Sequence, residues 1–162
     1  MMQELRHVKI SGFSLIELLV TLAILSVLAM LSVPVMQVAN QRIKEKELRL
    51  ALREIRTAID AYKLAYDDGK IMNSPLLSGY PTSLDVLVSG VPNQRDPLRQ
   101  KMYFLRKVPV DPMFDDGQTE QAIWGYRSYA SDAENPQEGV DVYDVYSTSE
   151  KVGLNGQAYK KW

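Results

Sequence analysis

Residues 13–39 read FSLIELLVTLAILSVLAMLSVPVMQVA and determine the architecture of the chain. Nearly every residue of this stretch is apolar, and its length fits the roughly 20 residues with which a helix crosses a bilayer. One carboxylate, Glu17, stands near its start. Because a charged side chain at the centre of a membrane helix costs about 2.5–3.5 kcal/mol, we expect Glu17 to have a compensating partner. The alternative is that Glu17 only snorkels to the membrane interface.

A short polar leader, MMQELRHVKISG, precedes the apolar segment. In a secretory signal, the small-residue cleavage site follows a shorter apolar core of about 7–15 residues. Here Ser11 and Gly12 come before the apolar run, so a cut after Gly12 would leave the hydrophobic helix on the product. Taken alone, the charges on the two flanks of the apolar segment predict that the leader lies outside the cytoplasm. The far flank at residues 41–49, QRIKEKELR, holds more Lys and Arg than the leader, and the positive-inside rule would place the leader outside.

The helical pattern continues beyond the apolar segment. Pro34 removes one backbone donor and is expected to bend or loosen the helix at that turn. Asp67, Asp68 and Gly69 supply a stop signal. Between these points a 4-3-4-3-4 spacing places apolar residues along one stripe of a helix. We expect this stripe to pack on the chain's own domain, with partner helices as the alternative; the stripe consists of Leu48, Leu52, Ile55, Ile59, Tyr62 and Tyr66.

Residues 70–162 are frequently interrupted by proline and glycine and carry no long helical period. Residues 81–90, PTSLDVLVSG, predict a short capped helix or turn. Residues 101–112 end in two prolines and suit an extended edge segment. Residues 123–131 and 140–147 are rich in aromatic and β-branched residues, so we predict that they pair as antiparallel strands. The resulting small sheet would gain core by packing on the helical stripe, which makes the fold class α+β.

Between the predicted strands lies an acidic stretch without a basic residue, SDAENPQEGVDVYD, at residues 131–144. Carboxylates that converge from a loop suit a hard cation such as calcium, which takes six to eight oxygen ligands. The stretch lacks the EF-hand spacing, so a merely solvated acidic turn is the alternative. A second acidic patch, formed by Asp111, Asp115 and Asp116, is expected to be solvated.

Composition excludes several functional classes. The chain has 162 residues, which suits one compact domain with an anchor. Its 19 basic and 20 acidic residues nearly balance, which argues against a nucleic-acid partner. It has no cysteine, and its single histidine, His7, lies in the leader, so a thiol nucleophile and a His-based triad in the folded body are ruled out. No phosphate loop or nucleophile elbow is present either, so we do not expect an enzyme.

The basic leader ending in Gly12, followed by FSLIELLV with Glu17 four residues after Phe13, resembles the class III signal of type IV pilins and type II secretion pseudopilins over residues 8–40. The resemblance implies that a prepilin peptidase cuts between Gly12 and Phe13 on the cytoplasmic side and methylates the new amine. It also implies a pilin-like fold, a single pass through the bacterial inner membrane with the N-terminus in the cytoplasm, and a head in the periplasm.

The body narrows the resemblance. Tyr80 to Tyr146, with YPTSLDVLV, YFLRKVPVDPM and WGYRSY before the acidic loop, is similar to the major pseudopilin family (protein G) of type II secretion. In that family the acidic loop binds calcium, which implies Asp132, Asp141 and Asp144 as ligands here. The lack of cysteine agrees with the resemblance to pseudopilins, because many true pilins close a C-terminal disulfide loop and this chain cannot form one.

The expected organisation follows from these patterns and this resemblance. Residues 1–12 form a cleaved leader, 13–39 a transmembrane and filament-core helix, 40–69 an amphipathic helix, and 70–162 a β-rich head. In a packed filament, Glu17 of one subunit would meet the amine of Phe13 of its neighbour, while Pro34 shapes the helix for assembly.

The expected function is that of a structural subunit of a type II secretion pseudopilus, which drives the export of folded proteins. Its expected partners are further copies of itself in a helical filament, minor pseudopilins, prepilin peptidase, the inner-membrane assembly platform and, before assembly, membrane lipid. Two alternatives stay open: a type IV pilin for adhesion, motility or DNA uptake, and a signal-anchored periplasmic enzyme or binding module.

Overall fold

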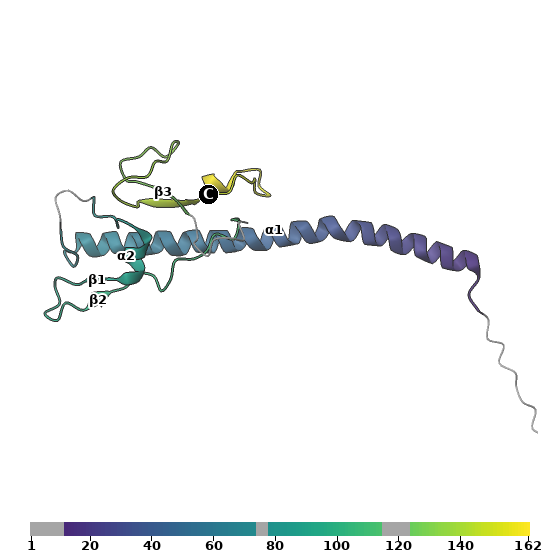
Figure 1. The fold of residues 1–162 in the computed structure, drawn as a ribbon, viewed down its shortest axis with the longest axis horizontal. Helices are drawn as coiled ribbons and strands as arrows, with labels where there is room; N and C mark the ends of the chain where they lie inside the picture. The colour runs from purple at the N-terminus through teal and green to yellow at the C-terminus, as the bar shows by residue number, and fades with distance from the viewer. Residues whose placement is uncertain (1–11, 74–77, 115–123) are drawn as a thin grey trace, which may run out of the picture. The chain divides into compact units, whose positions relative to one another are not determined.

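The computed structural model describes residues 12–73, 78–114 and 124–162. A long helix and a set of short elements form the α+β, pilin-like arrangement that the sequence predicts (Figure 1). The chain divides into two compact units, Met1–Asn40 and Gln41–Trp162. In chain order the elements are α1 (Leu15–Asp67), α2 (Leu84–Ser89), β1 (Val91–Pro92), β2 (Lys101–Met102), β3 (Trp124–Arg127), β4 (Asp144–Ser147) and the 3-10 turn η1 (Tyr159–Lys161).

The first unit carries the apolar half of α1. By length and composition this helix is long and apolar enough to cross a membrane. Every residue between Gly12 and Asn40 whose burial is described is exposed, including Leu18 at 60% and Val27 at 59%. α1 continues through Pro34. Because such an apolar surface is unfavourable in water, lipid or other protein must cover it.

The core of the second unit forms along the predicted stripe of α1. Leu48 and Ile55 are fully buried, and Tyr62 retains 8% of its exposure, whereas Tyr66 at the helix end is only half-buried. The stripe thus packs on the chain's own domain, as expected. The side chains of the other elements in the same cluster are Leu84, Leu87, Leu105, Met113, Trp124, Val142, Val145 and Tyr159.

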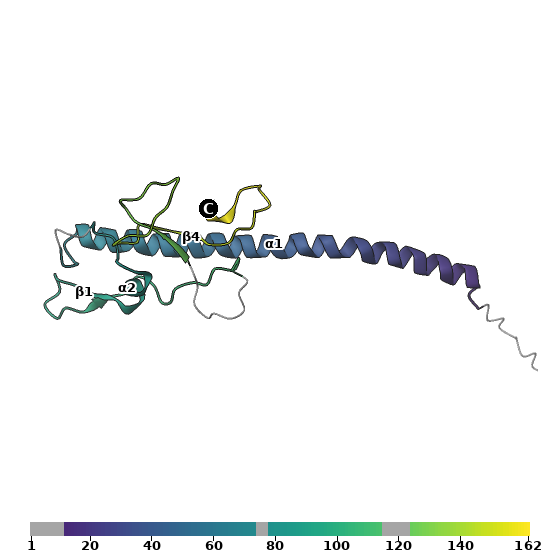
Figure 2. The ribbon, with the colours of Figure 1, turned by 45° about the horizontal axis from the view of Figure 1, so that its top comes forward.

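Strand β3 pairs antiparallel with β4, which confirms the predicted pairing, with Trp124 opposite Ser147 and Arg127 opposite Asp144. Strand β1 pairs antiparallel with β2 in a second two-stranded sheet. Within the second unit the two sheets lie on different sides of α1 (Figures 1 and 2). Both views agree on this arrangement, so residues 41–67 of α1 serve as the central element of the head.

α1 ends where the stop signal predicts. Gly69 adopts a left-handed backbone (φ 67°), and its amide donates to the carbonyl of Tyr66 at 2.9 Å. The amide of Lys70 donates to the carbonyl of Ala65, also at 2.9 Å. This pair of hydrogen bonds is the Schellman motif, which glycine favours because it lacks a Cβ.

The expectation that Asp111 is solvated is wrong. Asp111 is buried, with 1% of its surface exposed, rather than solvated. Its Oδ1 accepts the amide of Met113 at 2.8 Å, which forms a local turn across Pro112. The other two members of that patch, Asp115 and Asp116, lie outside the described residues.

Candidate assembly sites

The beginning of α1 carries a reciprocal pair of hydrogen bonds. The hydroxyl Oγ of Ser14 accepts the amide of Glu17 at 3.2 Å, and Oε2 of Glu17 accepts the amide of Ser14 at 3.5 Å. This S-x-x-E pattern is a capping box, in which two free backbone donors of a helix start are satisfied together. This capping box was not predicted, although the letters SLIE directly after Phe13 carry its signal.

The capping box directs the carboxylate of Glu17 toward the N-terminal end of the helix. A negative charge is favoured there by the helix dipole, because the first amides of a helix are unpaired. The atom that Glu17 contacts is the amide of Ser14, one residue after Phe13. Phe13 itself is 82% exposed. An acid is thus held beside the peptide that a cut after Gly12 would convert into a free amine.

In the head, Asp141 is buried among neutral donors. Its carboxylate accepts the hydroxyl of Ser78, the hydroxyl of Ser128 at 2.7 Å and the amide of Tyr129 at 2.9 Å. Burial alone raises the pKa of Asp141, but the hydrogen bonds from Ser78, Ser128 and Tyr129 outweigh it and hold the pKa below its ordinary value of 3.8. Asp141 is therefore a charged residue that fastens the segment before β4 to the end of β3.

Asp144 is bound by two arginines. Nε of Arg56 on α1 lies 2.7 Å from Oδ1, and Nη2 of Arg127 on β3 lies 3.2 Å from Oδ2. Arg56 also donates to the carbonyls of Val145 at 3.1 Å and Trp162 at 3.0 Å. One guanidinium therefore connects α1, β4 and the C-terminal segment, which uses the several donors of an arginine side chain.

The predicted calcium ligands are not brought together as one ligand set. Asp132 is exposed and accepts the amide of Glu134 at 3.3 Å, while Asp141 and Asp144 use their oxygens on the protein donors described above. Among the described residues, no group of three or more His, Asp or Glu side chains is arranged to hold a metal ion. Asp132, Asp141 and Asp144 therefore do not form one ligand set in this structure, and calcium binding, which the resemblance implies, remains to be measured by experiment.

A buried acid on α1 that sequence analysis did not single out holds the C-terminal segment. Glu45 is 5% exposed, and its Oε1 accepts the amide of Leu154 at 2.7 Å and the hydroxyl of Tyr159 at 3.1 Å. Gln41 donates to the same Tyr159 hydroxyl at 2.9 Å. These partners lie more than 100 positions apart in sequence, so no local pattern reveals the contact. Glu45 alternates with basic residues in KEKELR and looks like an ordinary surface charge.

Comparison with known proteins locates the recognisable part of the chain at its N-terminus. Residues 8–33 match the family model described as the prokaryotic N-terminal methylation motif. Comparison with curated proteins and with solved structures gave no match. The matched range covers the end of the leader, the capping box and most of the apolar helix. The motif implies processing by prepilin peptidase and assembly into a filament, and it is typical of structural subunits rather than enzymes. The chain thus carries the N-terminal methylation signal of a type IV pilin-like protein.

Proposed function

We propose that this protein is a filament subunit of the type II secretion pseudopilus, anchored by α1 in the bacterial inner membrane with its head in the periplasm. The observation that carries the filament role is the exposed apolar half of α1, which begins with the Ser14–Glu17 capping box directly after the expected cleavage site. Lipid covers this surface before assembly, and other copies of the helix cover it in the filament.

Glu17 supplies the register of assembly in this proposal. After cleavage, the charged amine of Phe13 and the carboxylate of a neighbouring Glu17 are both unfavourable in a low-dielectric environment when unpaired. Pairing them removes most of that penalty, so the arrangement that brings them together is selected. The capping box supports this pairing because it already holds the carboxylate of Glu17 at the N-terminal end of the helix before assembly.

The secretion pseudopilus is favoured over a type IV pilus by the similarity of Tyr80–Tyr146 to major pseudopilins and by the lack of cysteine. Minor pseudopilins and the inner-membrane assembly platform are then its partners, and neither nucleic acid nor a catalysed reaction has a role. A type IV pilus for adhesion, motility or DNA uptake is the second candidate, because the same N-terminal signal serves both machines.

Two measurements test the proposal. Mass spectrometry of the protein from its native cell should find a chain that begins with N-methylated Phe13; an intact Met1 would leave only a signal-anchored enzyme or binding module. A deletion strain should then fail to export proteins to the medium while it retains twitching motility. The opposite pair of phenotypes would assign the chain to a type IV pilus.

A further inference from the structure

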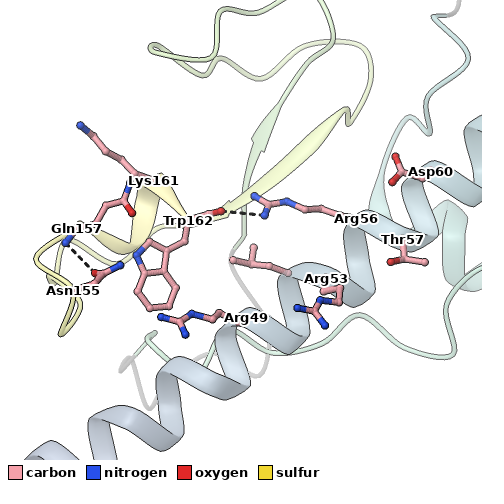
Figure 3. A pocket seen from close by; sticks show the side chains of 10 residues that line it. Arg49, Arg53, Arg56, Thr57, Asp60, Asn155, Gln157, Lys161 and Trp162 are labelled. Carbon is pink, nitrogen blue, oxygen red and sulfur yellow. Dashed lines mark hydrogen bonds between the residues drawn. The ribbon is translucent and has the colours of Figure 1, made fainter.

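A basic pocket lies on the head between α1 and the C-terminal segment (Figure 3). Its volume is about 610 Å³. α1 contributes Arg49, Arg53 and Arg56, and the C-terminal segment contributes Lys161 and the indole of Trp162. Asp60 is the one acid among the residues that line it. The pocket therefore presents excess positive charge beside an aromatic ring.

Only part of this charge is neutralised within the molecule. Arg56 is engaged by Asp144, as described above. Arg49 lies over the ring of Trp162 at 4.4 Å, while its Nη2 is 4.0 Å from Oε2 of Glu45 and its side chain is 57% exposed. Arg53 and Lys161 are exposed and form no ion pair with any described residue. Arg53 and the partly paired Arg49 thus remain available to an acidic partner, whereas the side chain of Lys161 points away from them (Figure 3).

The same chain carries a complementary surface, the acidic tip, formed by Asp132, Glu134 and Glu138. All three are exposed in the loop between β3 and β4. Residues 128–150 contain no Lys or Arg, and the nearest basic residue before this range is Arg127, which pairs with Asp144. The amide of Glu134 donates to Oδ1 of Asp132 at 3.3 Å, which leaves the other oxygen of that carboxylate without a hydrogen bond from this amide.

Within one molecule the acidic tip does not occupy the basic pocket. Residues 133–136 line a separate pocket of about 640 Å³, together with Lys160 and Lys161. Among the described residues, no ion pair within 4.0 Å joins these lysines to the tip. Lys161 and Gln157 line both pockets and separate the tip from the arginines. Glu134 thus lies in one pocket with Lys160 and Lys161 without an ion pair to them, and the tip does not reach Arg49 and Arg53 of the basic pocket.

We propose that the acidic tip of one copy docks in the basic pocket of a second copy when the heads are brought together. This inference rests on the proposed filament, which supplies the high local concentration of heads. Exposed charge pairs add little affinity but strongly discriminate between orientations, because like charges repel in the wrong ones. The contact would set how heads pack, whereas α1 supplies the association itself. With a net charge of −1, whole copies do not repel one another.

Cross-linking tests the contact directly, because the chain has no cysteine of its own. Two full-length copies, one with Arg53→Cys and one with Glu134→Cys, are expressed together in the native cell and oxidised. We expect a mixed dimer on a non-reducing gel. The matched control pairs Arg53→Cys with Asp85→Cys, an exposed acid on α2. No mixed dimer, or an equal amount with the control, would overturn the proposal.

Charge exchange provides the second measurement. Arg53→Glu or Glu134→Arg alone should reduce the yield of sheared filaments several-fold, and the double exchange in one chain should restore most of it. Single variants that assemble like the wild type would refute the docking while the filament role stands. If the wild type is processed but makes no filaments, the proposed function fails, and the cross-link between membrane-embedded copies still decides whether the two surfaces meet.

Discussion

Nε of Arg56 lies 2.7 Å from the carboxylate of Asp144, so a single side chain on the long helix binds the last strand of the head directly. Arg127 approaches the other oxygen of the same carboxylate at 3.2 Å. Three elements, α1, β3 and β4, therefore meet at one acid. Strand β4 also contains Val145, which is fully buried in the core. The ion pair between Arg56 and Asp144 therefore holds β4 in the position in which Val145 packs into the core.

Asp144→Ala should destabilise the head. Two partly buried guanidinium groups lose their acceptor, and the loss is expected to be about 1–3 kcal/mol in the free energy of unfolding. Urea denaturation of the full chain in detergent, followed by tryptophan fluorescence, measures it. Asp67→Ala is the matched control, because Asp67 pairs with Lys63 on the exposed surface and should contribute much less. Equal effects of the two substitutions would contradict the assignment.

Acid should weaken the head through Asp141. Since the folded pKa lies below the ordinary value of 3.8, the unfolded chain binds a proton more readily than the folded one. The stabilisation is therefore fully present above the unfolded pKa and is lost as the pH falls through the folded pKa. Unfolding temperatures measured from neutral pH down to about pH 2 should therefore fall in the acidic range; this acid-induced decrease is called the acid limb below.

Asp141→Asn identifies the group responsible for that pH dependence. The variant should be less stable than the wild type at neutral pH and should lose less stability on acidification. Asp60→Asn, a change at an exposed acid on α1, serves as the control and should leave the acid limb unchanged. An unaltered limb in Asp141→Asn would mean that other carboxylates govern acid unfolding.

Chelation should leave the unfolding temperature of the head unchanged. Asp141 and Asp144 already receive hydrogen bonds from Ser128, Tyr129, Arg56 and other protein donors, so a cation is not needed to balance them. Thermal unfolding with excess EDTA and with excess calcium measures the effect. A calcium-dependent rise that Asp132→Ala abolishes would establish the calcium site that the family resemblance implies.

Glu17→Gln should block assembly but preserve processing. Glutamine still offers an oxygen to the amide of Ser14, so the helix cap survives, whereas the charge that would pair with the amine of Phe13 is lost. Filament yield and the mass of the mature N-terminus are measured together. Filaments at the wild-type level would show that Glu17 acts through the cap alone.

Ser14→Ala provides the complementary test. It removes the hydroxyl that accepts the Glu17 amide and retains the acid, with an expected loss of about 1 kcal/mol in helix-start stability. Assembly should therefore be reduced less than in Glu17→Gln. A complete block in Ser14→Ala with normal cleavage would show that the position of the carboxylate matters as much as its charge.

The sequence by itself determined the elements with strong local patterns. The 4-3-4-3-4 spacing from Leu48 to Tyr66 predicted the buried stripe of α1, because a helix repeats every 3.6 residues. Gly69 fixed the end of the helix, and alternation around Trp124 and Val145 predicted the antiparallel pair. The apolar run after Gly12 and the lone Glu17 indicated the methylation signal that the family comparison then found. The buried stripe, the helix end and the strand pair follow from side-chain chemistry within a few neighbouring residues, whereas the methylation signal was identified by its resemblance to a known family.

Only the tertiary structure decided which charges are internal. Asp132, Asp141 and Asp144 look equivalent in one acidic stretch, yet Asp141 is buried on hydroxyls, Asp144 is bound by two arginines and Asp132 is exposed. Glu45 looks like a surface charge and holds the C-terminal segment instead. Burial and the partners of these charges depend on contacts with residues between 12 and 109 positions away, and Coulomb energies change several-fold with burial. A carboxylate's role is therefore set by the folded surroundings, whereas a helix can be recognised from its own period.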